Sequence, residues 1–200
     1  MMNYKILFLG PSDSPILQWL KKNNENVFST EKKITTEYVI ENKFNFLISY
    51  GYRFILRKEI LSLFTDKAIN LHLSFLPYNR GADPNFWSFI DGTPKGVSIH
   101  FLDEGIDTGD IIVQKEVSFG LPEVETLSSS YNKLQKEIQN LFFQNWDSIK
   151  KQKNIISTQK GISTTHKFKD KKDLMYLMNP DGWNTKLSKL VDFSRKLKNL

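Results

Sequence analysis

The most informative stretch of the chain is NLHLSFLP at residues 70–77, which continues an apolar run. Side chains of a strand alternate between the two faces of a sheet, so Asn70 and His72 would lie side by side on one face, opposite Leu71. An amide and an imidazole on so apolar a strand need hydrogen-bond partners or a substrate. The stretch therefore predicts a central strand with a polar pair on one face.

The composition is that of one ordinary globular domain, alone or with a small appendage. Of the 200 residues 40% are hydrophobic, and 15 Phe and 4 Trp supply enough apolar surface for a core. The absence of cysteine excludes a disulfide scaffold, a thiol nucleophile and a Cys-ligated zinc site, and it fits a reducing cytoplasm. The apolar run at residues 4–9 is too short for a signal peptide, and no segment approaches the roughly 20 apolar residues of a membrane span. We therefore expect a cytoplasmic protein without a membrane-embedded part.

Apolar runs and helix-like stretches alternate along the chain, which is typical of an α/β fold with a mostly parallel sheet. Hydrophobic residues at steps of three and four then predict one long amphipathic helix over residues 126–151, packed on the sheet. Before it, we expect strands at residues 5–9, 44–49, 68–76, 96–102 and 111–117, and helices at residues 16–22, 57–64 and 84–90.

The basic character of the chain is concentrated in its last quarter. Residues 151–200 hold 12 of the 28 Lys and Arg residues but 4 of the 22 Asp and Glu residues. Such a tail is either a solvated lysine-rich surface or a surface that faces phosphate, nucleic acid or a membrane. We expect a short strand at residues 161–168 and helices at residues 170–178 and 187–197, too little for a second core. The predicted division is a domain of residues 1–152 and a basic extension of residues 153–200, which packs on that domain or forms a dimer.

Asn70, His72 and Asp107 are the candidates for chemistry. An amide donates hydrogen bonds without charge, an imidazole carries a proton near neutral pH, and a carboxylate can orient the imidazole or accept a proton. Together they could stabilise an oxyanion and move protons during acyl transfer to an amine. Ser74 lacks the surroundings of a serine nucleophile, and one His with scattered acids lacks the spacing of a metal site. From the residues alone, a buried His satisfied by its neighbours is the alternative.

Two loops are further candidates for ligand binding. GPSDSP at residues 10–15 follows a strand and precedes a helix, where backbone N–H groups can bind an anion, although an ordinary turn explains it as well. DEGIDTGD at residues 103–110 does not fit a calcium loop, so it is either a solvated turn or a loop that brings Asp107 to the ligand-binding edge of the sheet. We expect His100 to be structural and His166 to lie on the surface or at an interface.

Five spaced blocks of sequence resemble the N10-formyltetrahydrofolate-dependent formyltransferase family. This family includes glycinamide ribonucleotide transformylase, methionyl-tRNA formyltransferase and the sugar N-formyltransferases. The resemblance is strong over residues 70–117 and looser over residues 1–69 and 118–150. It implies an enzyme with a Rossmann-like fold that uses N10-formyltetrahydrofolate as formyl donor and no metal. The blocks are NLH at 70–72, SFLP at 74–77, RGADP at 80–84, GVSIH at 96–100 and DEGIDTG at 103–109.

By this resemblance the catalytic residues are Asn70, His72 and Asp107. The implied reaction is direct attack of a substrate amine on the formyl carbon of the folate. Asn70 and protonated His72 would stabilise the oxyanion, and Asp107 would tune His72 and assist proton removal. The resemblance places the pterin between the turn that precedes the catalytic strand and the acidic loop. The implied folate-binding residues are Tyr50, Gly51, Tyr52, Phe54, Leu56, Leu102 and Gly105.

Within the family the chain is most similar to the sugar N-formyltransferases. The residues after 151 show no counterpart of the C-terminal β-barrel of methionyl-tRNA formyltransferases, and two prolines in GPSDSP remove donors that a phosphate loop would need. The implied acceptor is a nucleotide-linked amino-deoxysugar, most often dTDP-4-amino-4,6-dideoxyglucose, used for the O-antigen of lipopolysaccharide. The implied substrate-binding residues are Ser12, Asp13, Tyr78, Arg80, Gly81, Ala82, Asn85 and Trp87.

The resemblance also implies a homodimer formed through the region after the core, and neither a membrane nor nucleic acid as partner. Two alternatives lie in the same family, an enzyme like methionyl-tRNA formyltransferase and one like the purine transformylase. A third is of another class, a non-enzymatic α/β module that binds nucleic acid through the basic tail. The intact set of Asn70, His72 and Asp107 argues against that module.

Overall fold

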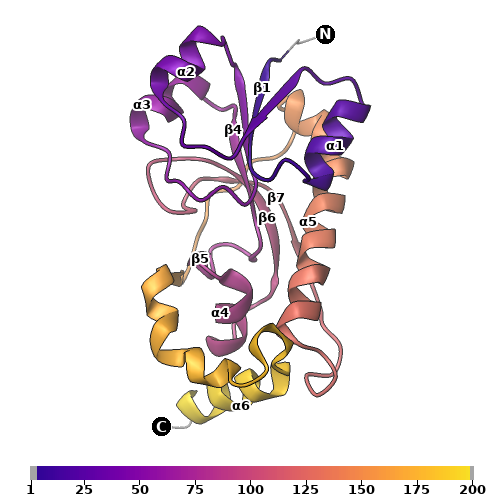
Figure 1. Ribbon diagram of the computed structural model, residues 1–200, viewed down its shortest axis with the longest axis vertical. Coiled ribbons are helices and arrows are strands. Elements are labelled where there is room, and N and C mark those ends of the chain that lie inside the picture. The colour runs from indigo at the N-terminus through magenta and orange to yellow at the C-terminus, as the bar shows by residue number, and fades with distance from the viewer. Residues whose placement is uncertain (1–3, 199–200) are drawn as a thin grey trace. The chain divides into compact units, whose positions relative to one another are not determined.

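The computed structural model describes residues 4–198 and contains a six-stranded sheet (Figure 1). The strands lie in the order β2-β1-β3-β4-β6-β7. The pairs β1 with β2, β1 with β3 and β3 with β4 are parallel. The bounds are β1 Ile6–Leu9, β2 Val27–Thr30, β3 Phe46–Ser49, β4 Ala68–His72, β6 Gly96–Phe101 and β7 Ile111–Glu116.

The edge strand β7 runs antiparallel to its neighbour β6. At one end of the pair the Phe101 N–H donates to the Asp110 carbonyl oxygen at 3.0 Å, and at the other end the Val117 N–H donates to the Lys95 carbonyl oxygen at 2.8 Å. Residue numbers rise on one strand as they fall on the other, which is the antiparallel pattern. The predicted α/β fold with a mostly parallel sheet is therefore confirmed, with an antiparallel pair of strands, β6 and β7, at one edge.

The helices alternate with the strands, as expected for parallel connections. A separate two-stranded parallel sheet pairs β5 with β8. Its bounds are β5 Arg80–Gly81 and β8 Thr165–His166. The α-helices are α1 Pro15–Lys22, α2 Thr36–Glu41, α3 Lys58–Leu61, α4 Pro84–Ile90, α5 Leu127–Lys150 and α6 Leu187–Lys198, and the 3-10 helices are Ser62–Phe64, Phe168–Met178 and Gly182–Asn184.

The chain forms two compact units, each assembled from three separate stretches. The strands β6 and β7 and the helix α5 each contribute residues to both units. The division that the sequence places after residue 152 stays a prediction. The first unit holds the residues up to His72, Ile99–Val113 and Gln139–Thr158, and the second holds Leu73–Ser98, Gln114–Ile138 and the residues from Gln159.

Helices cover both faces of the sheet in the first unit (Figure 1). On one face, Val39 of α2 and Ile60 of α3 pack in a buried cluster with Leu7 of β1. On the opposite face, the ring of Trp146 of α5 lies edge-on to that of Phe46 of β3, with centroids 5.3 Å apart. The parallel strands are therefore buried on both sides, which explains their nearly continuous apolar sequences.

The second unit has its own apolar cluster, in which α4 packs against α6 (Figure 1). Phe86 and Ile90 of α4 are buried with Leu187 and Leu190 of α6, and Leu127 at the start of α5 joins them. The C-terminal residues therefore complete a core with α4.

The predicted helices at residues 16–22, 84–90, 126–151 and 187–197 are confirmed to within two residues. The predicted strand at 68–76 ends earlier, at His72, because the Leu76 N–H donates to the Ser98 hydroxyl at 3.1 Å and Pro77 has no N–H. The predicted helix at 57–64 continues as a 3-10 turn after Leu61. The strand at 161–168 is reduced to the two residues of β8.

The sequence did not predict β2, α2 or β5. β2 is an edge strand with no buried residue, and α2 buries only Val39, so neither shows an apolar period. α2 begins because the Thr35 side chain accepts a hydrogen bond from the Tyr38 N–H at 3.2 Å. Short polar elements of this kind depend on neighbours that are distant in sequence.

Replacing Trp146 by Ala should destabilise the protein by about 3–5 kcal/mol, because it would leave a cavity between α5 and Phe46. Phe168→Ala is the matched control, since that ring is exposed and its loss should cost no more than about 0.5 kcal/mol. Urea unfolding of both variants measures the difference. Equal losses of stability would contradict the packing described for α5.

Candidate active site

Four polar side chains meet inside the first unit, at the end of β4. Asn70 and His72 lie on β4, His100 lies on β6, and Asp107 lies in the loop between β6 and β7. β6 is the neighbour of β4 in the sheet, so His100 comes from the strand beside the polar pair. The site is thus formed at the end of β4, where His100 of β6 and the loop after β6 meet the polar pair.

The carboxylate of Asp107 contacts the other three side chains. Its Oδ1 accepts a hydrogen bond from Asn70 Nδ2 at 3.1 Å and lies 3.4 Å from His100 Nε2. Its Oδ2 lies 3.5 Å from His72 Nδ1. One acidic group therefore fixes the amide and holds one imidazole within ion-pair distance on each of its oxygens.

The four groups are largely shielded from water. The side chain of His72 is 8% exposed, that of Asp107 13% and that of His100 1%. Charges interact more strongly in such surroundings than in bulk water, and each buried polar atom needs a partner. A substrate would have to contact His72 and Asp107 through the small part of each side chain that stays exposed.

Hydrogen bonding selects the tautomer of His100. Its Nδ1 lies 2.7 Å from the carbonyl oxygen of Phe101, and because a carbonyl only accepts, Nδ1 must carry a proton. In the neutral ring Nε2 is then the acceptor, and Asn70 Nδ2 at 3.2 Å is its donor. Asn70 therefore directs its two N–H bonds towards Asp107 and His100, which sets the orientation of the amide.

The loop that carries Asp107 is tightly constrained. Asp107 itself has φ of +53°, a left-handed conformation that Asp tolerates better than most residues. Asp103 accepts hydrogen bonds from the Gly105 N–H at 3.1 Å and the Thr108 hydroxyl at 2.6 Å. A side chain at Gly109 would place its Cβ 1.9 Å from the Phe101 carbonyl oxygen, so only glycine fits against β6. The loop geometry therefore aims Asp107 at β4.

The structure brings together Asn70, His72 and Asp107, which the sequence selected, and adds His100, which the sequence analysis expected to be structural. The signal for His100 was present, because it alternates with Val97 and Ile99 on a buried strand as Asn70 does with Leu71. The alternation alone could not show that Asn70 of β4 and His100 of β6 both face the loop that carries Asp107. The catalytic roles of the trio stay predictions.

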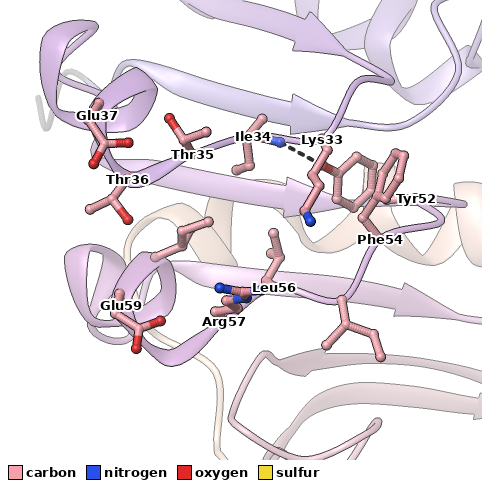
Figure 2. A pocket seen from close by; sticks show the side chains of 12 residues that line it. Lys33, Ile34, Thr35, Thr36, Glu37, Tyr52, Phe54, Leu56, Arg57 and Glu59 are labelled. Atoms are coloured by element: carbon pink, nitrogen blue, oxygen red, sulfur yellow. Dashed lines mark hydrogen bonds between the residues drawn. The ribbon is translucent and has the colours of Figure 1, made fainter.

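A cavity of about 360 Å³ lies in the first unit between the segment that leads into α2 and the segment that leads into α3 (Figure 2). Three of the predicted folate-binding residues, Tyr52, Phe54 and Leu56, line it. The other four do not: Tyr50 is buried, Leu102 packs against the buried cluster that includes Leu7, and Gly51 and Gly105 lie in exposed turns. None of the four active-site side chains lines the cavity.

The cavity has an apolar floor and charged walls. Lys33 and Arg57 extend from opposite walls, and Glu37 and Glu59 lie farther along them (Figure 2). The Tyr52 hydroxyl accepts from the Ile34 N–H at 3.2 Å and donates to the Lys32 carbonyl at 2.9 Å, which ties the walls together. Burial raises the pKa of Tyr52, so its phenol stays neutral at pH 7. Sequence reasoning did not identify Lys33 or Arg57.

The predicted substrate-binding residues fall into two groups. Ser12 and Asp13 are exposed in the first unit, and the Ser12 N–H donates to Glu31 Oε1 at 3.1 Å, so a carboxylate already uses a donor that an anion would need. Asn85 is buried, with its amide donating to the Leu127 carbonyl and the Ser130 hydroxyl. The second group lies in the second unit, before or within α4: Tyr78, Arg80, Gly81, Ala82, Asn85 and Trp87.

Within residues 4–198, none of the helices has the length and apolar character of a membrane-spanning segment. No group of three or more His, Asp or Glu side chains in that range is arranged to hold a metal ion.

Residues 12–145 match the family described as formyl transferase. The chain therefore belongs to the formyl transferase family. The crystal structure of the formyltransferase PseJ from Anoxybacillus kamchatkensis, in complex with UDP-4,6-dideoxy-4-formamido-L-AltNAc and tetrahydrofolate, is 42% identical and superposes with a TM-score of 0.88. That match covers 94% of this chain and 98% of PseJ.

Two methionyl-tRNA formyltransferases are also similar in sequence. The one from Thermodesulfovibrio yellowstonii is 37% identical over 126 residues, which are 62% of this chain and 38% of that protein. The one from Prochlorococcus marinus is 30% identical over 187 residues, which are 90% of this chain and 54% of that protein. The chain thus spans about half or less of the length of these relatives.

The tautomer of His100 can be observed directly. In a ¹⁵N-histidine-labelled sample, we expect Nδ1 of His100 to be protonated and Nε2 to be unprotonated at pH 7, because of the Phe101 carbonyl and the Asn70 amide. Two-bond ¹H–¹⁵N spectra measure this, and His100→Asn assigns the signals. A His100 ring protonated at Nε2 would contradict the hydrogen-bond directions described here.

Proposed function

We propose that the protein transfers the formyl group of N10-formyltetrahydrofolate to the primary amine of a nucleotide-linked amino-deoxysugar. The observation that carries this proposal is the arrangement of Asn70, His72 and His100 around the Asp107 carboxylate. An amide donor, an imidazole and a carboxylate at one strand end suit the polarisation of a carbonyl and the movement of one proton. Membership of the formyl transferase family supports the reaction type.

The cavity beside Tyr52 suits the folate. Its volume of about 360 Å³ is in the range of small-molecule sites, and its apolar floor suits a flat aromatic system. The cations Lys33 and Arg57 on its walls suit the carboxylates of a glutamyl tail. The family resemblance and the tetrahydrofolate bound in PseJ support the same donor.

In the proposed reaction, each of the four side chains has a separate role. As the amine attacks the carbon, negative charge develops on the formyl oxygen. Protonated His72 donates a hydrogen bond to that oxygen, and the Asn70 N–H that faces Asp107 is redirected to it. Asp107 stabilises the charged imidazole and receives, directly or through water, the proton that the amine loses. The bond between the formyl carbon and N10 then breaks as the carbonyl reforms, and N10 takes up the proton that Asp107 received from the amine. His100 keeps the Asn70 amide in its orientation through the 3.2 Å contact with Nδ2.

The acceptor is proposed to be a 4-amino-4,6-dideoxy sugar linked to UDP. PseJ, at 42% identity over nearly its whole length, carries the formylated product of such a sugar. The dTDP-linked sugar and the role in O-antigen synthesis stay predictions, as do the homodimer and the cytoplasmic location. The methionyl-tRNA relatives favour initiator tRNA as the alternative acceptor, although this chain spans about half or less of their length.

A panel of acceptors tests the proposal. With N10-formyltetrahydrofolate present, we expect turnover of UDP-4-amino-4,6-dideoxy-L-AltNAc, and slower or absent turnover of dTDP-4-amino-4,6-dideoxyglucose. Release of tetrahydrofolate and the mass of the product measure the reaction. Glycinamide ribonucleotide and charged initiator tRNA serve as the competing acceptors, and a preference for the tRNA would reject the sugar assignment.

Asp107→Asn and His72→Asn should each lower kcat by at least about 100-fold, the range of a general acid–base contribution. Asp107→Asn removes the negative charge that faces both imidazoles, and His72→Asn removes the group that carries the proton. Glu104→Gln is the matched control, because that carboxylate is exposed in the same loop and pairs with Lys58 instead. Near-normal rates in both active-site variants would show that the catalytic assignment is wrong.

A further inference from the structure

A segment of the C-terminal region lies along the loop that carries Arg80. β8 pairs with β5 in parallel, within the second unit. The Arg80 N–H donates to the Thr164 carbonyl and the Ala82 N–H to the His166 carbonyl, both at 2.9 Å. The Asn79 N–H donates to the Thr164 hydroxyl at 2.8 Å. The backbone of the loop is therefore held by residues more than 80 positions later in the chain.

Gly81 is required for this pairing. Its φ is +88°, in the left-handed region, and a Cβ there would lie 2.2 Å from the His166 carbonyl oxygen. Any other residue at this position would push the segment away from the loop. The glycine of the RGA block therefore admits a second strand, which sequence analysis did not foresee.

The side chain of His166 is locked in place. Its ring stacks on that of Trp87, with centroids 3.7 Å apart and planes 2° from parallel. Its Nε2 lies 2.7 Å from Asp91 Oδ2, and the side chain is 17% exposed. His166 is therefore partly buried against α4, which supplies Trp87, and Asp91 at its C-terminal end. The expectation that it lies at an interface stays a prediction.

Asp91 connects His166 to the residue before Arg80. Its Oδ2 also accepts a hydrogen bond from Asn79 Nδ2 at 3.0 Å, and Asn79 Oδ1 accepts one from the Thr93 hydroxyl at 2.7 Å. Asn79 is fully buried. One carboxylate oxygen therefore ties the histidine of β8 to the start of the loop.

The guanidinium of Arg80 is held by an uncharged partner. Its Nε and Nη2 both donate to Gln159 Oε1, at 3.1 Å and 2.6 Å. Gln159 accepts without neutralising the charge, and within residues 4–198 no carboxylate forms an ion pair with Arg80. One edge of the guanidinium is thereby fixed, and the edge that includes Nη1 can meet an anion.

We propose that residues 159–166 form a strap that orients Arg80 towards the diphosphate of the nucleotide sugar, with Gln159 and His166 as positioning residues. This inference rests on the proposed function, since a sugar linked to UDP or dTDP carries a diphosphate. A guanidinium with a fixed direction binds phosphate oxygens with less loss of side-chain freedom than a mobile one. The strap thus sets the affinity for the acceptor, and its residues take no part in the chemistry.

Three variants separate the contacts of the strap. Gln159→Ala removes the partner of Arg80 and should raise KM for the amino sugar about tenfold, the effect of one hydrogen bond to a charged group. His166→Ala removes the stack and the Asp91 contact and should raise it at least as much. His166→Phe keeps a ring on Trp87 and should recover part of the loss. In all three, kcat and KM for the folate should stay within about twofold of wild type.

Lys160→Ala is the control, because it removes an exposed cation from the strap without changing a contact with the loop. Hydrogen–deuterium exchange adds a readout that needs no substrate. The amides of residues 79–82 should exchange faster in His166→Ala, and at the wild-type rate in Gln159→Ala, since only the first loosens the backbone pairing.

The outcomes distinguish the inference from the proposed function. Faster exchange in His166→Ala with an unchanged acceptor KM would overturn the strap's role while leaving formyl transfer intact. Equal rises in KM for folate and acceptor would also overturn it. If wild type formylates no amino sugar, the proposed function fails, and calorimetry with UDP then tests the anion site alone. Equal affinity of wild type and Arg80→Ala for UDP would reject that site.

Discussion

The active site depends on one interaction, the contact of the nearly buried Asp107 carboxylate with three side chains. A carboxylate that has lost most of its water needs hydrogen-bond donors. Asn70 donates to its Oδ1, His72 Nδ1 lies 3.5 Å from its Oδ2, and His100 lies beside it and holds the Asn70 amide. The dependence is mutual, because the amide of Asn70 is oriented only while both Asp107 and His100 are present. Removing any one partner leaves a buried polar group unsatisfied, which costs more than the lost contact itself.

The sheet explains why these groups can meet. β4 lies between β3 and β6, and helices cover both faces of the sheet. A polar side chain in the middle of β4 would therefore be buried without a hydrogen-bond partner. Asn70 and His72 avoid that cost because the loop after β6 brings the Asp107 carboxylate against them. The left-handed backbone conformation of Asp107 and the absence of a side chain at Gly109 allow that loop to lie close to β4 and β6. The polar pair and the loop therefore stabilise one another.

Features with a local pattern could be predicted from the sequence, and features that depend on distant partners could not. The alternation through Asn70, Leu71 and His72 predicted the polar face, and the three-and-four spacing predicted α5 almost to the residue. His100 shows the same alternation, but which face of β6 meets β4 is decided by sheet geometry. His166 carried no signal at all, because its partners Trp87 and Asp91 lie some 75 residues earlier.

The basic tail shows how charge counting can mislead about function. Its excess of lysines suggested a surface for an anion, yet the contacts with the Arg80 loop come from backbone groups, the neutral Gln159 and one imidazole. Lys171 is itself nearly buried, 3.5 Å from Asp83 and over the ring of Trp183. At least one of the lysines therefore stabilises the fold of the second unit. In our proposal, the tail contributes to anion binding by fixing the direction of Arg80, which lies outside the tail. That direction is set by hydrogen bonds and packing, which a count of charges does not describe.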